Sequence, residues 1–485
     1  MRHPRIPDAI REVARAAPDA VAVIERDRAV GFAALDTMAR RMAGWLERQG
    51  LRPGDRVGIT LREGLAHLVV SLGLMRLGCD QLGLASVDPR GVRAALAARA
   101  GLVAVIGDRP QDGLDGPGLI LPDHAAIAAD ATLGDAHLPA TGPDGTTVLI
   151  ATSGTTGRPK LVRLSEQVLR RRALGRESAV ARRHAPIPVE FPQARWAMLV
   201  TLAAGGSWVF HDPAGPPLPE LLRRHRVGAV TLSPLRAEAL LREASCAAWP
   251  PATALHLAGA PVPGDLRARL QAGLTRNLHV LYGTTECAVC AIAGPEDHQR
   301  HPDGIGRPWA ATFAIRDEAG GEVPAGTPGV LHVLSAGIAD GYLDDPEAEA
   351  AAFLPGGWYR TGDLVSRADD GQLVFHGRAD DMMILGTIKI SPAEIERVAA
   401  GFPGLSDCAV FPVRAGAMGD VPVLAAVPVA PGALDTAALL NHCRARLGLR
   451  APRKVVLLPA LPRNGAGKVV RRELAALAGL SAAAP

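Results

Sequence analysis

Residues 152–160 bring together side chains and backbone groups that can bind a phosphate. The string TSGTTGRPK holds two glycines, four hydroxyl side chains and one lysine, and it follows an apolar run typical of a strand, TTVLIATS (146–153). Glycines let backbone N–H groups approach an anion, hydroxyls add donors, and lysine adds positive charge. The Walker pattern is not satisfied here, nor in GAGKVV (465–470), which has no Ser or Thr after Lys468. The segment therefore predicts a phosphate loop of another kind.

Lysine and tyrosine are rare in this chain and point to individual positions. The lysines are Lys160, Lys389, Lys454 and Lys468, and the tyrosines are Tyr282, Tyr342 and Tyr359. Arginine fills the remaining basic positions, so a lysine indicates a site that needs a compact point charge.

Five segments resemble, in order, the motifs of the adenylate-forming superfamily of acyl- and aryl-CoA ligases, peptide-synthetase adenylation domains and luciferases. They are TSGTTGRPK (152–160), YGTTE (282–286), YRTGDL (359–364), GRADD with SPAEIE (377–381 and 391–396), and PRNGAGKVVRREL (462–474). The more loosely matching GLRPGDRVGITL (50–61) fits the family's N-terminal region. The resemblance implies an AMP-forming acid–thiol ligase that uses ATP and Mg²⁺. A carboxylic acid would become an acyl-adenylate with release of pyrophosphate. The acyl group would then pass to the thiol of CoA or of phosphopantetheine on an acyl carrier protein.

The resemblance also assigns roles to individual residues. Lys468, Thr285 and Glu286 would be catalytic, and Glu286 would coordinate Mg²⁺, which prefers oxygen ligands. Tyr282 would pack on the adenine, and Asp363 and Arg378 would bind the ribose. The nucleotide-binding residues implied are Thr152, Ser153, Gly154, Thr155, Thr156, Gly157, Lys160, Gly259, Ala260, Pro261, Tyr282, Asp363 and Arg378.

Taken singly, the same residues have ordinary structural interpretations. Asp363 could be a turn residue, Arg378 could pair with Asp380 or Asp381, Lys468 could be a solvated loop lysine, and Glu286 could cap a helix. The ordered set of motifs favours the functional roles.

Alternating strand and helix patterns predict an α/β fold. We expect a large N-terminal part with parallel-rich sheets flanked by helices, a small β-rich subdomain from about residue 304, and a mobile α+β C-terminal domain. The domains would be 1–379 and 380–485, with Asp380 at the hinge between them. Residues 109–145, rich in Gly, Pro and Asp, read as a long surface connection.

Three positions depart from the family pattern. Glu166 stands where a histidine often follows the loop. Thr387 stands where a glycine keeps the pantetheine tunnel open, which makes transfer to an amine or another nucleophile the main enzymatic alternative. In IPVEFPQARW (187–196), Pro192 replaces the Asp of α-amino-acid activators, and Glu190 either faces the acyl pocket or is solvated or salt-bridged.

Two clusters have both a structural and a functional interpretation. Cys287 and Cys290 form a lone C-x-x-C, which indicates buried wall or core residues rather than zinc or redox work. An arginine cluster on an expected helix is either a solvated face or a patch for CoA phosphates or a carrier protein. Its members are Arg170, Arg171, Arg172, Arg176, Arg182 and Arg183.

Composition limits the remaining classes. The net charge is only +4 with both signs interspersed, which argues against a nucleic-acid partner. We expect no membrane span, since no apolar run reaches about 18 residues. The first residues lack an apolar leader region, and six cysteines in 485 residues make no disulfide scaffold, so we expect a cytoplasmic enzyme. A non-catalytic nucleotide-binding protein is the rival from another class.

Overall fold

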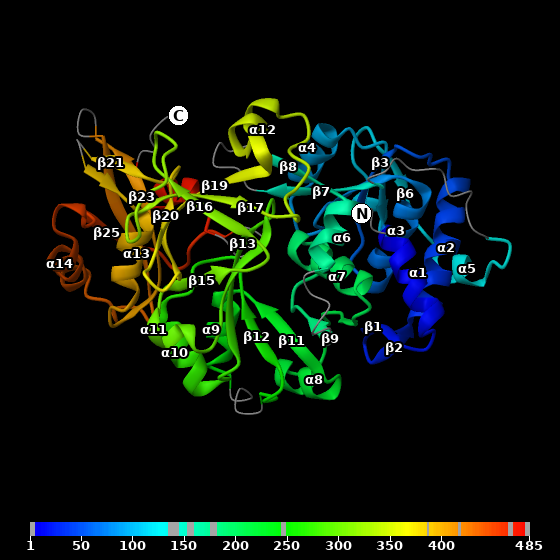
Figure 1. Ribbon diagram of the computed structural model, residues 1–485, viewed down its shortest axis with the longest axis horizontal. Helices are drawn as coiled ribbons and strands as arrows, with labels where there is room; N and C mark the ends of the chain where they lie inside the picture. Colours follow the sequence, from blue (N-terminus) through cyan, green and yellow to red (C-terminus); the bar gives the residue numbers. More distant parts are fainter. Residues whose placement is uncertain are drawn as a thin grey trace.

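The computed structural model describes residues 5–133, 145–152, 160–174, 182–243, 249–385, 388–415, 419–463 and 469–480. Its blue N-terminal part and its orange-to-red C-terminal part lie at opposite ends of the long axis (Figure 1). In the described part of the chain, no helix combines the length and apolar character that a membrane crossing needs.

The first sheet has six strands in the order β6-β5-β3-β4-β7-β8, parallel except for the antiparallel pair β7–β8. Its strands are β3 (Arg56–Thr60), β4 (Asp80–Gly83), β5 (Ala104–Gly107), β6 (Gly118–Ile120), β7 (Thr147–Thr152) and β8 (Lys160–Ser165). The helices of this region are α1 (Ile6–Ala16), α2 (Phe32–Arg48), α3 (Gly64–Leu77), α4 (Arg90–Ala100) and α5 (His124–Ala129). Helix α3 is buried on nearly every side, because its apolar residues leave no polar stripe.

One sequence expectation is wrong in this region. Residues 109–145 are not simply a surface connection, because β6 extends the sheet beside β5 and α5 packs on α2. The strand is short, and Gly and Pro around it conceal its apolar residues from a reading of the sequence.

A second, larger sheet runs in the order β16-β17-β19-β20-β15-β14-β13-β12-β11-β9-β10-β1-β2, with β18 beside β19. Strands β9 to β13 pair in parallel where they neighbour one another, and the strands from β13 to β20 pair antiparallel. The change from parallel to antiparallel confirms the expected α/β series followed by a β-rich part. The first strands are β1 (Val21–Glu25), β2 (Arg28–Gly31), β9 (Arg182–His184), β10 (Trp208–Val209), β11 (Val227–Leu232), β12 (Ala254–Leu257) and β13 (Leu278–Thr284). The later ones are β14 (Ala288–Ala293), β15 (Gly304–Pro308), β16 (Thr312–Arg316), β17 (Gly329–Leu334), β18 (Phe353–Leu354), β19 (Trp358–Arg367) and β20 (Leu373–Arg378).

Helix α6 leads from β8 of the first sheet to β9, and α7–α12 lie between strands of the second sheet in the sequence. They are α6 (Glu166–Leu174), α7 (Pro192–Ala203), α8 (Leu218–Arg224), α9 (Pro234–Leu240), α10 (Gly264–Gly273), α11 (Asp297–Arg300) and α12 (Pro346–Ala352). Several begin with a proline at the first turn, where the missing N–H costs no hydrogen bond.

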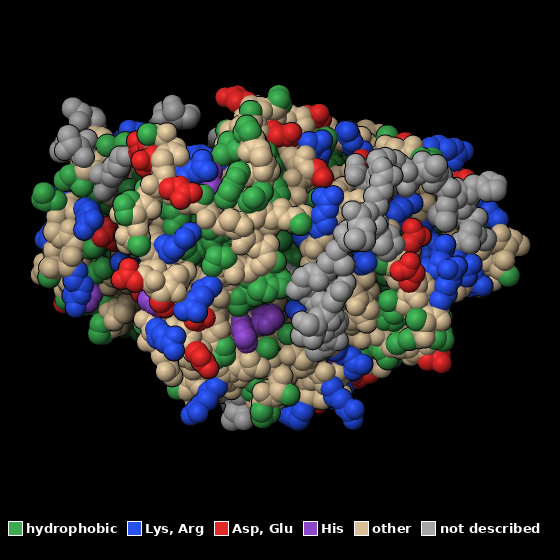
Figure 2. Space-filling model, viewed as in Figure 1, with side chains coloured by type: hydrophobic (Ala, Val, Ile, Leu, Met, Phe, Trp, Pro, Cys, Tyr) green, Lys and Arg blue, Asp and Glu red, His purple; other side chains and the backbone are tan. Residues whose placement is uncertain are grey.

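The C-terminal part has its own sheets and apolar clusters. Its elements are β21 (Met383–Leu385), β22 (Ile388–Ile390), α13 (Pro392–Ala400), β23 (Leu405–Arg414), β24 (Asp420–Pro428), α14 (Thr436–Leu447), β25 (Lys454–Leu457) and α15 (Arg471–Leu477). Two apolar clusters pack helices against the sheet β23-β24-β25: one holds α13 and α14, and the other holds α15. All buried residues of both clusters lie at position 383 or later. On the face shown in Figure 2, acidic and basic side chains are interspersed and hydrophobic side chains gather near the middle.

Candidate active site

The two ends of the expected phosphate loop lie on neighbouring strands. Thr152 ends β7 and Lys160 begins β8, and the two residues face each other in the antiparallel register. The Thr152 hydroxyl donates to the Lys160 carbonyl at 3.4 Å. The intervening Ser153, Gly154, Thr155, Thr156 and Gly157 lie outside the described residues.

Three of the expected nucleotide residues are joined by hydrogen bonds. The Tyr282 hydroxyl donates to Asp363 Oδ2 at 2.6 Å, and Arg378 Nη1 donates to Asp363 Oδ1 at 3.0 Å. Strand pairing brings this about, because Asp363 on β19 lies opposite Arg378 on β20. Burial and the Asp363 carboxylate raise the pKa of Tyr282, so its hydroxyl stays protonated and donates. We name these three residues the Asp363 triad.

Arg378 also confirms one structural interpretation. Its Nη2 lies 3.6 Å from Asp380 Oδ2, so it pairs with Asp363 and with Asp380 together. Burial opposes the charged form, but the carboxylates of Asp363 and Asp380 raise the pKa of Arg378 on balance. Asp363 is 5% exposed, and the residue is held inside a paired strand rather than in an exposed turn.

Thr285 and Glu286 occupy the turn between β13 and β14. The turn requires the preceding glycine, because a Cβ on Gly283 would lie 1.8 Å from the Ala288 carbonyl oxygen. Arg172 Nη2 donates to the carbonyls of Thr285 at 2.9 Å and Glu286 at 3.0 Å. The Tyr342 hydroxyl donates to Glu286 Oε1 at 2.9 Å, and Glu286 is largely buried. Glu286 therefore does not cap a helix.

Gly259, Ala260 and Pro261 lie exposed just beyond the carboxyl end of β12. Strand β12 is parallel to β13, so this segment and Tyr282 leave the sheet at the same edge. Lys468 lies outside the described residues, as do Gly386 and Thr387. The structure thus brings together the Asp363 triad, Thr285 with Glu286, and the ends of the phosphate loop.

The arginine cluster does not lie on one helix face, because Arg182 and Arg183 are on β9, and Arg176 is outside the described residues. Arg170 and Arg172 are buried, and Arg170 Nη1 donates to the Ala203 carbonyl while Arg172 binds backbone around Glu286. Burial lowers the pKa of Arg172 to about 10. Both the solvated-face and the CoA-patch interpretations are therefore wrong for these two residues, whereas Arg171 is exposed. Sequence reasoning missed Arg172 as a site residue because a charge run does not reveal which face of a helix is covered.

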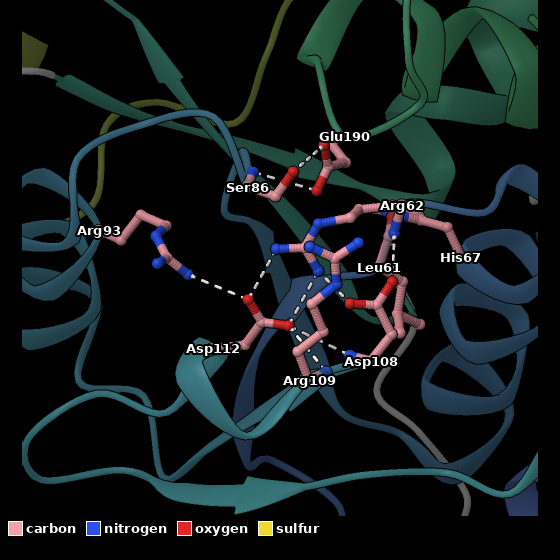
Figure 3. A network of polar contacts seen from close by, with 9 residues as sticks. All are labelled: Leu61, Arg62, His67, Ser86, Arg93, Asp108, Arg109, Asp112 and Glu190. Carbon is pink, nitrogen blue, oxygen red and sulfur yellow. Dashed lines mark hydrogen bonds and ion pairs between the residues drawn. The ribbon is translucent and has the colours of Figure 1, made fainter. Parts of the chain in front are cut away.

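Glu190 is shielded from solvent, and among the described residues no cationic side chain lies within ion-pair distance of it. It is 3% exposed and accepts from the Ser86 amide at 3.1 Å and the Ser86 hydroxyl at 2.9 Å (Figure 3). Burial raises its pKa. In Figure 3 it lies beside an ion-pair network in which Arg62 binds Asp112 at 2.9 Å. Ser86 follows β4, so Glu190 ties the segment before α7 to the first sheet.

Glu166 has a structural role that explains the departure from histidine. Its carboxylate is fully buried and pairs with Arg5 Nη2 at 3.0 Å. It also accepts from the amides of Ile6 and Thr146, each at 2.9 Å. This residue therefore fastens the start of α1 to the strand that leads into the phosphate loop.

Cys287 and Cys290 are core residues, as expected. Each is 1% exposed, and their sulfurs lie 3.7 Å apart beneath the Glu286 turn. The hydrogen bond between the two sulfurs lowers the pKa of Cys287 and raises that of Cys290. No group of three or more His, Cys, Asp or Glu side chains in the described ranges is arranged to hold a metal ion.

Comparison with known proteins identifies the family to which this chain belongs. The model of the AMP-binding enzyme family matches residues 10–343, and that of the AMP-binding enzyme C-terminal domain matches residues 394–468. The chain belongs to the AMP-binding enzyme family. It is therefore a member of the adenylate-forming superfamily.

Relatives of this AMP-binding enzyme differ in what their names say they do. It is 30% identical to a feruloyl-CoA synthase of Amycolatopsis sp, over 95% of this chain and 96% of the relative. It is 31% identical to phosphinothricin tripeptide synthetase PhsC of Streptomyces viridochromogenes, over 97% of this chain but only 45% of the relative. This chain thus spans less than half of that relative. Among solved structures, the amide bond synthetase McbA from Marinactinospora thermotolerans matches with a TM-score of 0.85 and 25% identity, over 97% and 99% of the two chains. ATP-bound MatB from Rhodopseudomonas palustris matches with a TM-score of 0.86 and 25% identity, over 98% of each chain.

Proposed function

We propose that this AMP-binding enzyme activates a carboxylic acid with ATP and passes the acyl group to a pantetheine thiol, of CoA or of a carrier protein. The observation that carries the proposal is the Asp363 triad next to Glu286. A buried carboxylate held by Tyr282 and Arg378 retains lone pairs for ribose hydroxyls, since each carboxylate oxygen can accept more than one hydrogen bond.

The residues present fit ATP and Mg²⁺. Glu286 offers a carboxylate, the donor type that Mg²⁺ prefers, and nucleotide phosphates commonly complete such a site. When bound, the ion would neutralise phosphate charge. Lys160 at the start of β8 would add positive charge to the pyrophosphate side, and Thr285 would donate to the α-phosphate. Lys468 would approach the same phosphate from the C-terminal domain, where charge builds up in the transition state.

We propose that residues 380–485 form a separate mobile domain that turns about Asp380 between the two half-reactions. The separate apolar clusters of the C-terminal part support this boundary. The contact of Asp380 with Arg378 would couple the hinge to the ribose side of the site.

Pyrophosphate exchange with a panel of carboxylic acids tests the adenylation step. At least one acid should drive exchange of labelled pyrophosphate into ATP. Asp363→Asn should lower kcat/KM for ATP at least tenfold, because one charge-assisted ribose contact and the pairing with Arg378 are weakened. Asp370→Asn is the matched control, since Asp370 lies on the β19–β20 turn and pairs with His301 at 3.0 Å, outside the site. The proposal would be contradicted if none of the acids drives pyrophosphate exchange, or if Asp363→Asn and Asp370→Asn have equal effects.

Two observations favour a second acceptor class. The similarity to an amide bond synthetase and the threonine at 387 favour an amine as the alternative acceptor. The discriminating measurement is product formation from pre-formed acyl-adenylate with CoA or with a panel of amines. If the acceptor is a thiol, the enzyme should form thioester from CoA, and Thr387→Gly should change the rate of thioester formation little. If the acceptor is an amine, the enzyme should leave the adenylate intact with CoA and form amide with one of the amines. Thr387→Gly could then gain thioester formation.

A further inference from the structure

Tyr342 connects two parts of the site that are far apart in the sequence. Its hydroxyl donates to Glu286 Oε1 at 2.9 Å, and the Lys160 ammonium lies 4.8 Å from the centre of its ring. The residue is 4% exposed, so both contacts are made away from bulk water. One side chain thus contacts the expected metal carboxylate and the lysine at the end of the phosphate loop.

The backbone of Tyr342 is fixed to the strand that follows this loop. Residue 342 forms a β-bridge with Val162 on β8. On either side, Arg163 donates to the Gly341 carbonyl at 2.9 Å and Leu343 donates to the Leu161 carbonyl at 2.8 Å. A displacement of β8 would therefore move the tyrosine with it.

Aromatic packing fixes the ring. Phe353 meets the Tyr342 ring edge-on, with the two ring centroids 5.2 Å apart. The Phe353 ring in turn packs against Tyr359, also with 5.2 Å between the centroids. Edge-to-face contacts of this kind hold a ring in one orientation.

The main chain of Glu286 is held independently. Arg172 donates to its carbonyl at 3.0 Å, and the Ala339 amide donates to the same oxygen at 2.7 Å. With the main chain fixed, rotation of the side chain is the remaining freedom, and the bond from Tyr342 removes it.

We propose that Tyr342 is a positioning residue that orients the Glu286 carboxylate toward the metal ion bound with ATP, and that it keeps this carboxylate in register with Lys160. The proposal rests on the proposed function, since it takes Glu286 as the metal carboxylate. With Oε1 held by the hydroxyl, Oε2 would remain available as the oxygen that binds the cation. Tyr342 itself touches neither the acid nor the nucleotide in this role.

The test compares Tyr342→Phe with Tyr359→Phe. Both variants remove one buried hydroxyl from the same aromatic cluster, but only the first removes the bond to Glu286. The first readout is binding of Mn²⁺ in the presence of a non-hydrolysable ATP analogue, followed by electron paramagnetic resonance. The second is the Mg²⁺ dependence of pyrophosphate exchange, with the KM of the acid measured alongside.

Tyr342→Phe should weaken Mn²⁺ binding and raise the Mg²⁺ requirement about tenfold, the effect expected of one hydrogen bond to a charged group. The KM of the acid should stay within about twofold of wild type, and Tyr359→Phe should change Mn²⁺ binding by less than about threefold. Unchanged Mn²⁺ binding in Tyr342→Phe, or an equal loss in both variants, would overturn the proposal. If wild type neither binds Mn²⁺ with the analogue nor exchanges pyrophosphate, the proposed function itself fails.

A measurement on the wild-type side chain covers the case in which Tyr342→Phe does not fold. The chain has three tyrosines, so incorporation of 3-fluorotyrosine gives three fluorine resonances. Tyr282→Phe and Tyr359→Phe assign two of them, and the third belongs to Tyr342. On titration with Mn²⁺ and the ATP analogue, the Tyr342 resonance should broaden at the lowest metal occupancy. Broadening of the other two with Tyr342 unaffected would contradict the assignment.

Discussion

Glu166→Gln should destabilise the N-terminal part of the chain, although it alters no residue that we place in the active site. The side chain is fully buried and accepts from three residues, Arg5, Ile6 and Thr146. Glutamine keeps the size and one acceptor, but it removes the negative charge beside Arg5. It also places an NH₂ group against one of the backbone or side-chain donors.

The expected loss follows from burial. Removal of one partner from a buried ion pair costs about 3–5 kcal/mol, because the other charge stays desolvated. The retained amide oxygen and the 18% exposure of the Arg5 side chain put Glu166→Gln at the low end, about 3 kcal/mol. An exposed pair of the same chemistry gives the matched control. Glu220→Gln breaks a 2.7 Å pair with Arg224 in which both side chains are more than 40% exposed, so solvent screening should make the loss of stability far smaller.

The assay is urea unfolding followed by tryptophan fluorescence, with limited proteolysis to locate the change. Early cleavage in Glu166→Gln should fall near α1, whose N-terminus loses its anchor. Arg5→Gln and the double variant complete a cycle, which should return a coupling of about 1–3 kcal/mol. A Glu166→Gln variant as stable as Glu220→Gln, or a coupling near zero, would refute this role for the carboxylate.

Three further outcomes follow from the site and the core. Lys468→Ala should slow acyl-adenylate formation at least about a hundredfold, or 2.7 kcal/mol, in single-turnover assays while folding survives; a near-wild-type rate would exclude its catalytic role. Asp380→Pro fixes φ at the expected hinge, so the acyl-transfer step should lose more rate than adenylation, and equal losses would remove the hinge assignment. Burial lowers the pKa of His67 to about 3 and of His184 to about 4, so each is neutral in the folded protein and takes a proton on unfolding below pH 6.5. Stability should therefore fall as pH falls from 6.5 toward 4, by about 1.4 kcal/mol per pH unit for each histidine, and His184→Gln should reduce the slope by one such increment in urea titrations at several pH values.

Much of the fold could be predicted because its signals are local. Apolar runs such as 254–259 and 279–284 alternate with helical patterns, and they form the parallel strands β12 and β13. The short strand β6 was hidden by the glycine and proline around it. The end of a helix can also be predicted to within one or two residues. Helix α2 ends at Arg48, just before Gly50, whose φ of +95° favours glycine and stops the helix.

Some residues of the candidate site could likewise be predicted from local sequence signals, whereas others needed the tertiary structure. Asp363 and Arg378 could be singled out as candidate site residues from their motifs, and the structure joins them by a hydrogen bond that follows from the β19–β20 register. Arg172 could not, because its function depends on which face of α6 is covered by the Glu286 turn. Tyr342 had one signal, the scarcity of tyrosine, but its contact with Glu286 links residues 56 positions apart and needs the tertiary structure.

The central claim is that the acid is joined to AMP through its own carboxylate oxygen. The direct measurement uses an acid that drives pyrophosphate exchange, labelled with ¹⁸O in its carboxylate, and mass spectrometry of the nucleotide after a full turnover with acceptor. Attack of the acid on the α-phosphate, followed by transfer at the acyl carbon, predicts AMP that carries one ¹⁸O. Release of unlabelled AMP, or of ADP in place of AMP, would contradict the account.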